Sequence, residues 1–72
     1  MARTVTWLSE VPAQCDLCET PITNTFIDGK TVHGPWGIMC ISCHVLDGYG
    51  FGTGRGQKFE KVESGKFIKT KG

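Results

Sequence analysis

The sequence contains no long hydrophobic run. Apolar residues make up 39% of the chain, and no stretch of them approaches the roughly 18 consecutive residues of a membrane-spanning helix. The opening residues, MARTVTWLSEVP, contain one arginine but no apolar stretch of the length that a signal peptide requires. We therefore expect a cytoplasmic protein without membrane association, in a reducing compartment where disulfides are disfavoured.

Recognisable catalytic and nucleotide-binding motifs are also missing. The carboxylates are scattered, with no pair at a spacing suited to acid–base chemistry, and no G-x-S-x-G nucleophile elbow occurs. The stretch GYGFGTGRG, residues 48–56, has glycine at every second position. This spacing matches neither the G-x-G-x-x-G dinucleotide fingerprint nor a Walker loop. The sequence therefore predicts no enzyme and no nucleotide cofactor.

Neither sign of charge is in marked excess over the whole chain. Eight basic and seven acidic residues give a formal charge of +1. Residues 1–54 carry two basic and five acidic side chains, whereas residues 55–72 carry six basic and two acidic ones. The C-terminal part is therefore the candidate contact surface for a polyanion.

The chain is too short to bury much apolar surface. With 72 residues it forms one domain, and a core of this size rarely supplies more than about 3–5 kcal/mol. Natural chains of this length add disulfides, a metal or a partner. We expect a single domain over residues 1–72, with a zinc core at 15–48, a glycine-rich strip at 48–56 and a basic C-terminal hairpin at 57–72.

The four cysteines form two C-x-x-C pairs, Cys15 with Cys18 and Cys40 with Cys43, with 21 residues between them. Two such turns aim four sulfurs at one ion and complete a tetrahedron with Zn–S distances of about 2.3 Å. The spacing between the pairs is close to that of known zinc sites. The sequence therefore predicts one structural Zn²⁺, which contributes about 10–16 kcal/mol of apparent binding energy.

Other uses of these cysteines are weaker explanations. The sequence Cys40-x-x-Cys43-His44 also spells a c-type haem attachment motif, but haem would leave the first pair unused. A thioredoxin-type redox pair needs a βαβ context, which is missing. Exchange of one cysteine ligand for His44 is a minority alternative. Iron in place of zinc stays open, and disulfides require an exported chain.

The segment between the two pairs is expected to form a β-hairpin. Its turn lies either at residues 28–29 (Asp-Gly) or at residues 34–35 (Gly-Pro). We favour the second turn, because it gives longer strands and delivers Cys40 from a strand end. A short strand is expected over residues 4–8, where polar and apolar side chains alternate.

A short helix and a second hairpin are expected after the second pair. The stretch ISCHVLD, residues 41–47, permits one or two helical turns, capped at Ser42 and stopped by Gly48. Beyond the glycines, QKFEKV and KFIKT flank the turn sequence ESG. The expected fold is a small metal-stabilised α+β domain with two β-hairpins and one short helix.

The order of a cysteine turn, a hairpin and a second cysteine turn that opens a helix resembles treble-clef and zinc-ribbon proteins over residues 15–48. The segments GPWGIMCISCH and GFGTGRGQKF resemble a group of small bacteriophage zinc proteins. The resemblance implies four cysteine ligands and a phage origin, but no established activity. Treble clefs include HNH-type nucleases, a remote alternative, since neither His33 nor His44 is convincingly placed for catalysis.

The glycine-rich strip has three possible roles. In an extended chain its Tyr49, Phe51, Thr53 and Arg55 would share one face, and each glycine costs about 0.5–1 kcal/mol relative to alanine. The strip either folds tightly over the zinc site with its aromatics in the core, binds a ligand, or forms a mobile loop. Binding would use the aromatics for base stacking and the cations for phosphate.

We expect a non-catalytic, zinc-stabilised binding module whose partner is nucleic acid or, almost equally, a host protein of the replication or transcription machinery. Trp7 and Trp36 are expected in the core. The oligomeric state stays open. The expected binding residues are Tyr49, Phe51, Arg55, Lys58, Lys61, Lys66 and Lys69.

Overall fold

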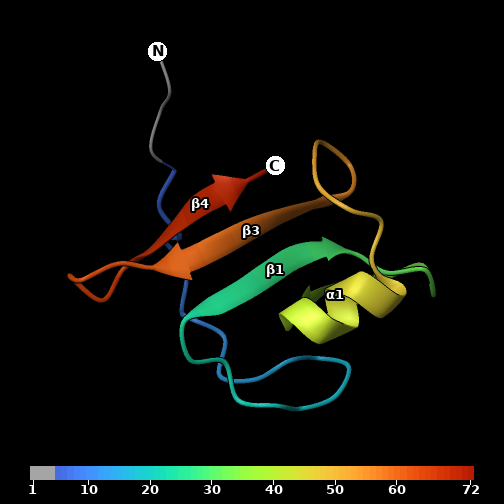
Figure 1. The fold of residues 1–72 in the computed structure, drawn as a ribbon, viewed down its shortest axis with the longest axis horizontal. Helices are drawn as coiled ribbons and strands as arrows, with labels where there is room; N and C mark the ends of the chain where they lie inside the picture. Colours follow the sequence, from blue (N-terminus) through green and yellow to red (C-terminus); the bar gives the residue numbers. More distant parts are fainter. Residues whose placement is uncertain (1–4) are drawn as a thin grey trace.

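The computed structural model describes residues 5–72, which form a four-stranded antiparallel sheet and one short helix (Figure 1). In chain order the elements are β1 (Thr25–Lys30), β2 (Trp36–Met39), α1 (Ile41–Asp47), β3 (Gly56–Lys61) and β4 (Phe67–Lys71). The strand order is β2-β1-β3-β4, so two hairpins meet through an antiparallel β1–β3 pair. The expected α+β architecture is confirmed. Within residues 5–72, no helix combines the length and apolar character that crossing a membrane requires.

The first hairpin turns at residues 31–35, as the favoured alternative predicts. The Thr31 hydroxyl donates a hydrogen bond to the Pro35 carbonyl oxygen at 2.9 Å. Gly34 adopts a left-handed φ of 111°, which only glycine adopts without strain. Because β2 ends directly before Cys40, the hairpin delivers this cysteine from a strand end.

The alternative turn at residues 28–29 is wrong, because both residues lie inside β1. Gly29 pairs with Gly37 of β2 and with Gly56 of β3. A Cβ atom at Gly29 would lie only 2.8 Å from the carbonyl oxygen of Arg55. Gly29 therefore serves close approach of two backbones and not a chain reversal.

The helix α1 begins directly after Cys40 and ends before Gly48. The carbonyl oxygen of Cys40 accepts a hydrogen bond from the His44 amide at 3.0 Å. The predicted cap at Ser42 is wrong, since Ser42 lies inside the helix and Cys40 takes the cap position without a side-chain hydrogen bond. The stop at Gly48 is confirmed, and its amide donates to the His44 carbonyl oxygen at 2.9 Å.

The second hairpin is confirmed, and its turn covers residues 62–66, between β3 and β4. The predicted strand over residues 4–8 is reduced to a single bridge between Thr6 and Ile68. Thr4 lies outside the described residues. The N-terminal segment thus extends the sheet beside β4 by one bridge only.

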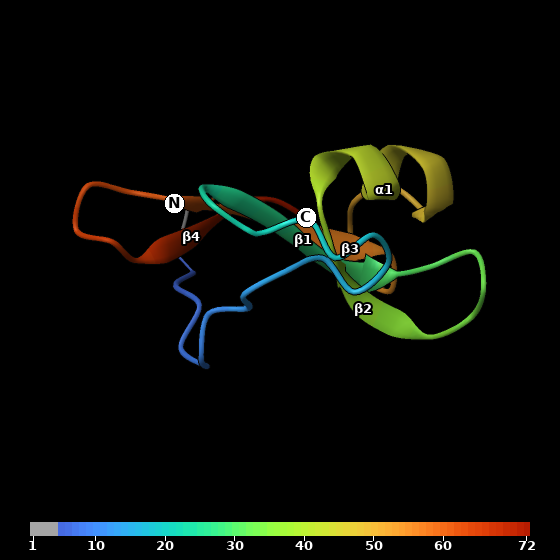
Figure 2. The same ribbon diagram turned by 90° about the horizontal axis from the view of Figure 1, so that it is seen from below.

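An aromatic core lies on one face of the sheet. Phe26, Phe59 and Phe67 are buried there, and the Trp7 ring packs edge-on against Phe26 and Phe59, with centroid distances of 5.1 Å. The N-terminal segment lies on this side, opposite the helix (Figure 2). Trp7 is a core residue, as expected. Trp36 is 53% exposed, against expectation, because it lies at the start of the edge strand β2.

The helix α1 covers the other face of the sheet (Figure 2). Ile27 of β1 lies opposite Met39 of β2, and both are almost fully buried. Ile27 follows Phe26 in β1, so its side chain points to the opposite face of the sheet, away from the aromatic core and toward the helix. Met39, which lies opposite Ile27, faces the same way. The sheet therefore separates the aromatic core from the layer that contains α1.

The glycine-rich strip forms a folded loop. Gly50, Gly52 and Gly54 have φ values of 80°, 124° and 77°, all in the left-handed region. Tyr49, Phe51, Thr53 and Arg55 therefore do not share one face, as they would in an extended chain. Gly52 and Gly56 form a bridge that closes the loop and leads into β3. The glycines are present because the backbone reverses direction with these dihedral angles.

Candidate metal centre

The four cysteines converge on one point. Their Sγ atoms all lie within 4.8 Å of one another, and the Sγ atoms of Cys18 and Cys40 are 3.7 Å apart. A tetrahedron with metal–sulfur distances of about 2.3 Å has edges of about 3.8 Å. The cysteines are therefore placed to hold a metal ion, and none of the four forms a disulfide.

A tight turn presents the first pair. The Cys15 amide donates to the Thr20 carbonyl oxygen, and the Glu19 amide donates to the Cys15 carbonyl oxygen, both at 2.9 Å. Glu19 closes the turn with a left-handed φ of 63°, which is uncommon for a residue with a side chain. The Leu17 amide lies 3.4 Å from the Cys15 sulfur and donates to it. Backbone amides thus favour a negative charge on sulfur here.

The second pair comes from the junction of β2 and α1. Cys40 precedes the helix and Cys43 lies in its first turn, so the helical geometry sets their separation. Asp16 connects this part to the first pair: its carboxylate accepts a hydrogen bond from the Ile38 amide at 2.8 Å. The Asp16 amide also donates to the Ile38 carbonyl oxygen, again at 2.8 Å.

Asp16 is a supporting residue that the sequence analysis did not identify. The available signal was its place between two ligands, in Cys15-Asp-Leu-Cys18. A short carboxylate side chain at that position accepts a hydrogen bond from a backbone amide of a neighbouring strand, and this bond orients the turn that carries the two cysteines. Only the structure identifies that strand as β2.

The thiols differ in how readily they ionise. The contact of Cys18 with the Thr20 hydroxyl, at 3.1 Å, lowers the pKa of Cys18 to about 6. Burial acts to raise the pKa of Cys15, but backbone hydrogen bonds outweigh it and the pKa is lowered. Burial, together with a hydrogen bond to Cys18, raises the pKa of Cys43. A divalent ion would deprotonate such a thiol when it coordinates it.

His44 is occupied elsewhere. Its Nε2 atom lies 2.8 Å from the Gly50 carbonyl oxygen, and its ring packs on Phe51 at 4.6 Å. Among residues 5–72, the metal-ligating cluster consists of four cysteines and includes no histidine. The arrangement therefore favours four sulfur ligands over exchange with His44, and it uses both pairs, unlike haem attachment.

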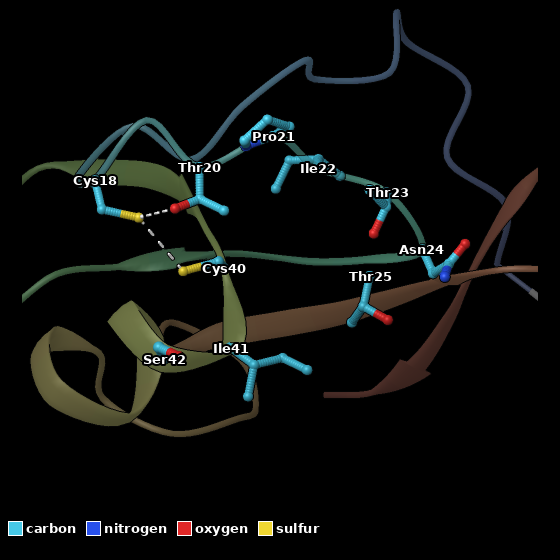
Figure 3. A pocket seen from close by; sticks show the side chains of 10 residues that line it. All are labelled: Cys18, Thr20, Pro21, Ile22, Thr23, Asn24, Thr25, Cys40, Ile41 and Ser42. Atoms are coloured by element: carbon cyan, nitrogen blue, oxygen red, sulfur yellow. Dashed lines mark hydrogen bonds between the residues drawn. The ribbon is translucent and has the colours of Figure 1, made fainter.

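One side of the centre is open to solvent. A surface cavity of about 430 Å³ lies beside Cys18 and Cys40, with residues 20–25 and the start of α1 as its other walls (Figure 3). Cys18 is exposed, whereas Cys15 is completely buried. A metal ion or a chelator therefore reaches the site from the side of Cys18.

Two of the predicted binding residues lie together at the end of the sheet. Tyr49 and Arg55 line a surface cavity with Lys30 and Gly54, and the Lys30 ammonium lies 5.7 Å from the centre of the Tyr49 ring. Lys30 is not among the binding residues predicted from the sequence. No local pattern marks it, because only the pairing of β1 with β3 brings it beside Arg55.

The helix side of the sheet carries a second group of these residues. Lys58 lies opposite Lys71 in the β3–β4 register, and the Lys71 ammonium lies 5.6 Å from the centre of the Phe51 ring. Lys58 and Phe51 belonged to the predicted set, whereas Lys71 did not.

The remaining predicted lysines lie elsewhere. Lys69 lies opposite Phe59 and Lys61 lies opposite Phe67, so both lysines project on the side of the aromatic core. Lys66 is in the exposed turn between β3 and β4. The structure therefore divides the seven predicted residues among the end of the sheet, its two faces and one turn.

No protein-family model, no curated protein and no solved structure matches this chain. Function must therefore be inferred from the geometry of the site.

Proposed function

We propose that this protein is a non-catalytic binding module of the treble-clef or zinc-ribbon type, held together by one structural zinc ion. The support is the order of elements, in which a cysteine turn precedes the β1–β2 hairpin and the second pair lies at the start of α1. Four sulfur ligands fill a tetrahedral coordination shell and leave no position for substrate, as in structural zinc sites.

We further propose nucleic acid as the partner. The observation that carries this proposal is the pairing of cations with aromatic rings around the glycine loop, Lys30 with Tyr49 and Lys71 with Phe51. Proteins that bind single strands combine aromatic surfaces for the bases with cations for the phosphates. A phage origin and action in the host cytoplasm are part of the proposal and rest on the sequence resemblance alone.

A salt titration tests the nucleic-acid proposal. Zinc-loaded protein is mixed with fluorescein-labelled single-stranded and double-stranded DNA and RNA, and anisotropy reports binding. We expect the logarithm of the binding constant to fall with the logarithm of salt concentration, by about 0.7–0.9 per phosphate neutralised. Absence of binding to every one of these probes at low salt would contradict the proposal. Elemental analysis of the protein as purified, before any metal is added, distinguishes zinc from iron.

A protein partner is the second candidate, favoured by the solvent-facing side of α1. Val45 and Leu46 are 75% and 78% exposed, and Ile41, one turn before Val45, is 51% exposed. Apolar side chains grouped on one exposed face are typical of docking surfaces. A protein captured from host lysate by the wild type, and lost with Val45→Glu and Leu46→Glu, would support this candidate.

A further inference from the structure

The cavity that contains Lys30 is built by two segments far apart in the sequence. Lys30 is the last residue of β1, whereas Tyr49, Gly54 and Arg55 belong to the glycine loop, which lies beside the end of β1 in Figure 1. The Lys30 amide donates a hydrogen bond to the Arg55 carbonyl oxygen at 2.8 Å. Backbone pairing therefore holds the two cationic residues next to each other.

Close backbone packing supports the same junction. A Cβ atom at Gly29, one residue before Lys30, would lie 3.0 Å from the Gly56 Cα atom. A Cβ atom at Gly56 would lie 2.9 Å from the Gly50 carbonyl oxygen. The loop thus contacts β1 through bare backbone, which leaves its side chains free to line the cavity.

The lining has the chemistry of an anion site with an aromatic wall. Its side chains are one lysine, one arginine and one tyrosine, without a carboxylate among them. Two neighbouring cations repel each other unless an anion lies between them. Tyr49 is 50% exposed, so part of its ring remains accessible beyond the contact with Lys30.

The size of the cavity limits the ligand. Its volume is about 330 Å³, at the lower end of the about 300–1,000 Å³ that is usual for small-molecule sites. One nucleotide is a ligand of this scale that offers both an anion and an aromatic plane. In a base-paired duplex the flat faces of the bases are stacked on one another, so they are not accessible to such a cavity.

We propose that this cavity binds one nucleotide unit, with its phosphate between Lys30 and Arg55 and its base on the ring of Tyr49. The inference rests on the proposed nucleic-acid function and makes it specific: the protein prefers single strands, whose bases are free to stack. A free nucleoside monophosphate has the same chemistry and is the other source of ligand.

Binding of a labelled oligothymidylate to zinc-loaded variants tests the cavity. We expect Lys30→Gln, Arg55→Gln and Tyr49→Ala each to weaken binding at least about fivefold. Tyr49→Phe, which keeps the aromatic ring, should retain most of the wild-type affinity. Lys66→Gln is the matched comparison, because it removes one positive charge in the β3–β4 turn. Lys66→Gln must weaken oligonucleotide binding less than Lys30→Gln or Arg55→Gln does. Zinc content and near-ultraviolet circular dichroism establish that each variant is folded.

A second measurement distinguishes failure of the cavity proposal from failure of the proposed nucleic-acid function. Thymidine monophosphate is titrated into ¹⁵N-labelled protein, and we expect the amide signals of Lys30, Tyr49 and Arg55 to shift. If the wild type binds the oligonucleotide but the variants bind equally well and these signals stay fixed, the cavity proposal is wrong and the nucleic-acid function stands. If the signals shift but no oligonucleotide binds, the cavity is a site for free nucleotides and the nucleic-acid function is wrong.

Discussion

Asp16 lies between two of the metal ligands and joins them to the sheet. Its carboxylate and its amide both bond to Ile38 of β2, each at 2.8 Å. These two contacts link the first cysteine turn to β2, the strand that ends directly before Cys40. In the folded protein the two contacts therefore align the two halves of the centre with each other.

We expect Asp16→Ala to weaken zinc binding about tenfold, because it removes a charge-assisted hydrogen bond worth about 1.5 kcal/mol. Competition with a chelating dye measures the affinity. Glu63→Ala, which removes the same charge in the turn between β3 and β4, serves as the control and should leave the affinity unchanged. Equal affinity of the two variants would show that Asp16 does not support the centre.

The protonation state of the cysteines predicts the proton balance of zinc binding. Because we expect the metal-free chain to be unfolded, its four cysteines have the ordinary thiol pKa of about 8.5 and are largely protonated at pH 7.5. Zinc uptake, which folds the chain and binds four thiolates, should therefore release about 3–4 protons.

Calorimetry in buffers of different ionisation enthalpy counts these protons. Zinc affinity should fall as the pH is lowered from 7.5 to 5, because protons compete with zinc for all four thiolates. Release of only one or two protons at pH 7.5 would contradict this account, because it would show that the metal-free chain keeps the folded site in which Cys18, with a pKa of about 6, is already ionised.

At the scale of elements, β1 is the centre of the molecule. It pairs with β2 on one side and β3 on the other, and its last residue reaches the glycine loop. Its two faces differ, with Phe26 in the aromatic core and Ile27 toward α1. Gly29 lets the backbone of β1 come close to the backbone of residues 55–56, which couples the loop to the sheet.

We expect Gly29→Ala to destabilise the protein by about 1–3 kcal/mol, because the new methyl group would lie 2.8 Å from the Arg55 carbonyl oxygen and the backbone must shift. Gly37→Ala in β2 is the comparison, since its methyl group would meet only the Asp16 side chain, at 3.3 Å. Urea denaturation of the zinc-loaded proteins measures the difference. A smaller loss at position 29 than at position 37 would contradict this account.

The whole molecule has too little core to depend on apolar burial alone. Within residues 5–72 the buried apolar side chains are Cys15, Phe26, Ile27, Met39, Phe59 and Phe67. A core of this size contributes about 3–5 kcal/mol, whereas a structural zinc site contributes about 10–16 kcal/mol of apparent binding energy. We therefore expect the sheet and a bound metal ion together, and not the sheet by itself, to keep the chain folded.

Removal of the metal by EDTA should therefore unfold the protein. We expect loss of the far-ultraviolet spectrum and of the cooperative thermal transition, and recovery of both when zinc is added back in reductant. The open side at Cys18 should make removal rapid. Metal-free protein with an unchanged spectrum and transition would contradict the structural role of the ion.

Much of this architecture is predictable from local sequence. The ends of the hairpins and the stop of α1 at Gly48 follow from glycine and proline positions and from alternation of side chains. The errors have physical reasons. Asp28-Gly29 has the composition of a turn but lies in β1, where glycine serves close packing, and Ser42 loses the cap position to Cys40.

The sequence by itself predicted the four cysteines of the candidate metal centre, because each C-x-x-C turn is a local structure whose spacing aims two sulfurs at one point. Only the tertiary structure decided which cations and rings meet. Lys30 and Arg55 are 25 positions apart, and they become neighbours because β1 pairs with β3. Strand pairing is a long-range choice set by burial of the two sheet faces, so no short stretch of sequence encodes it.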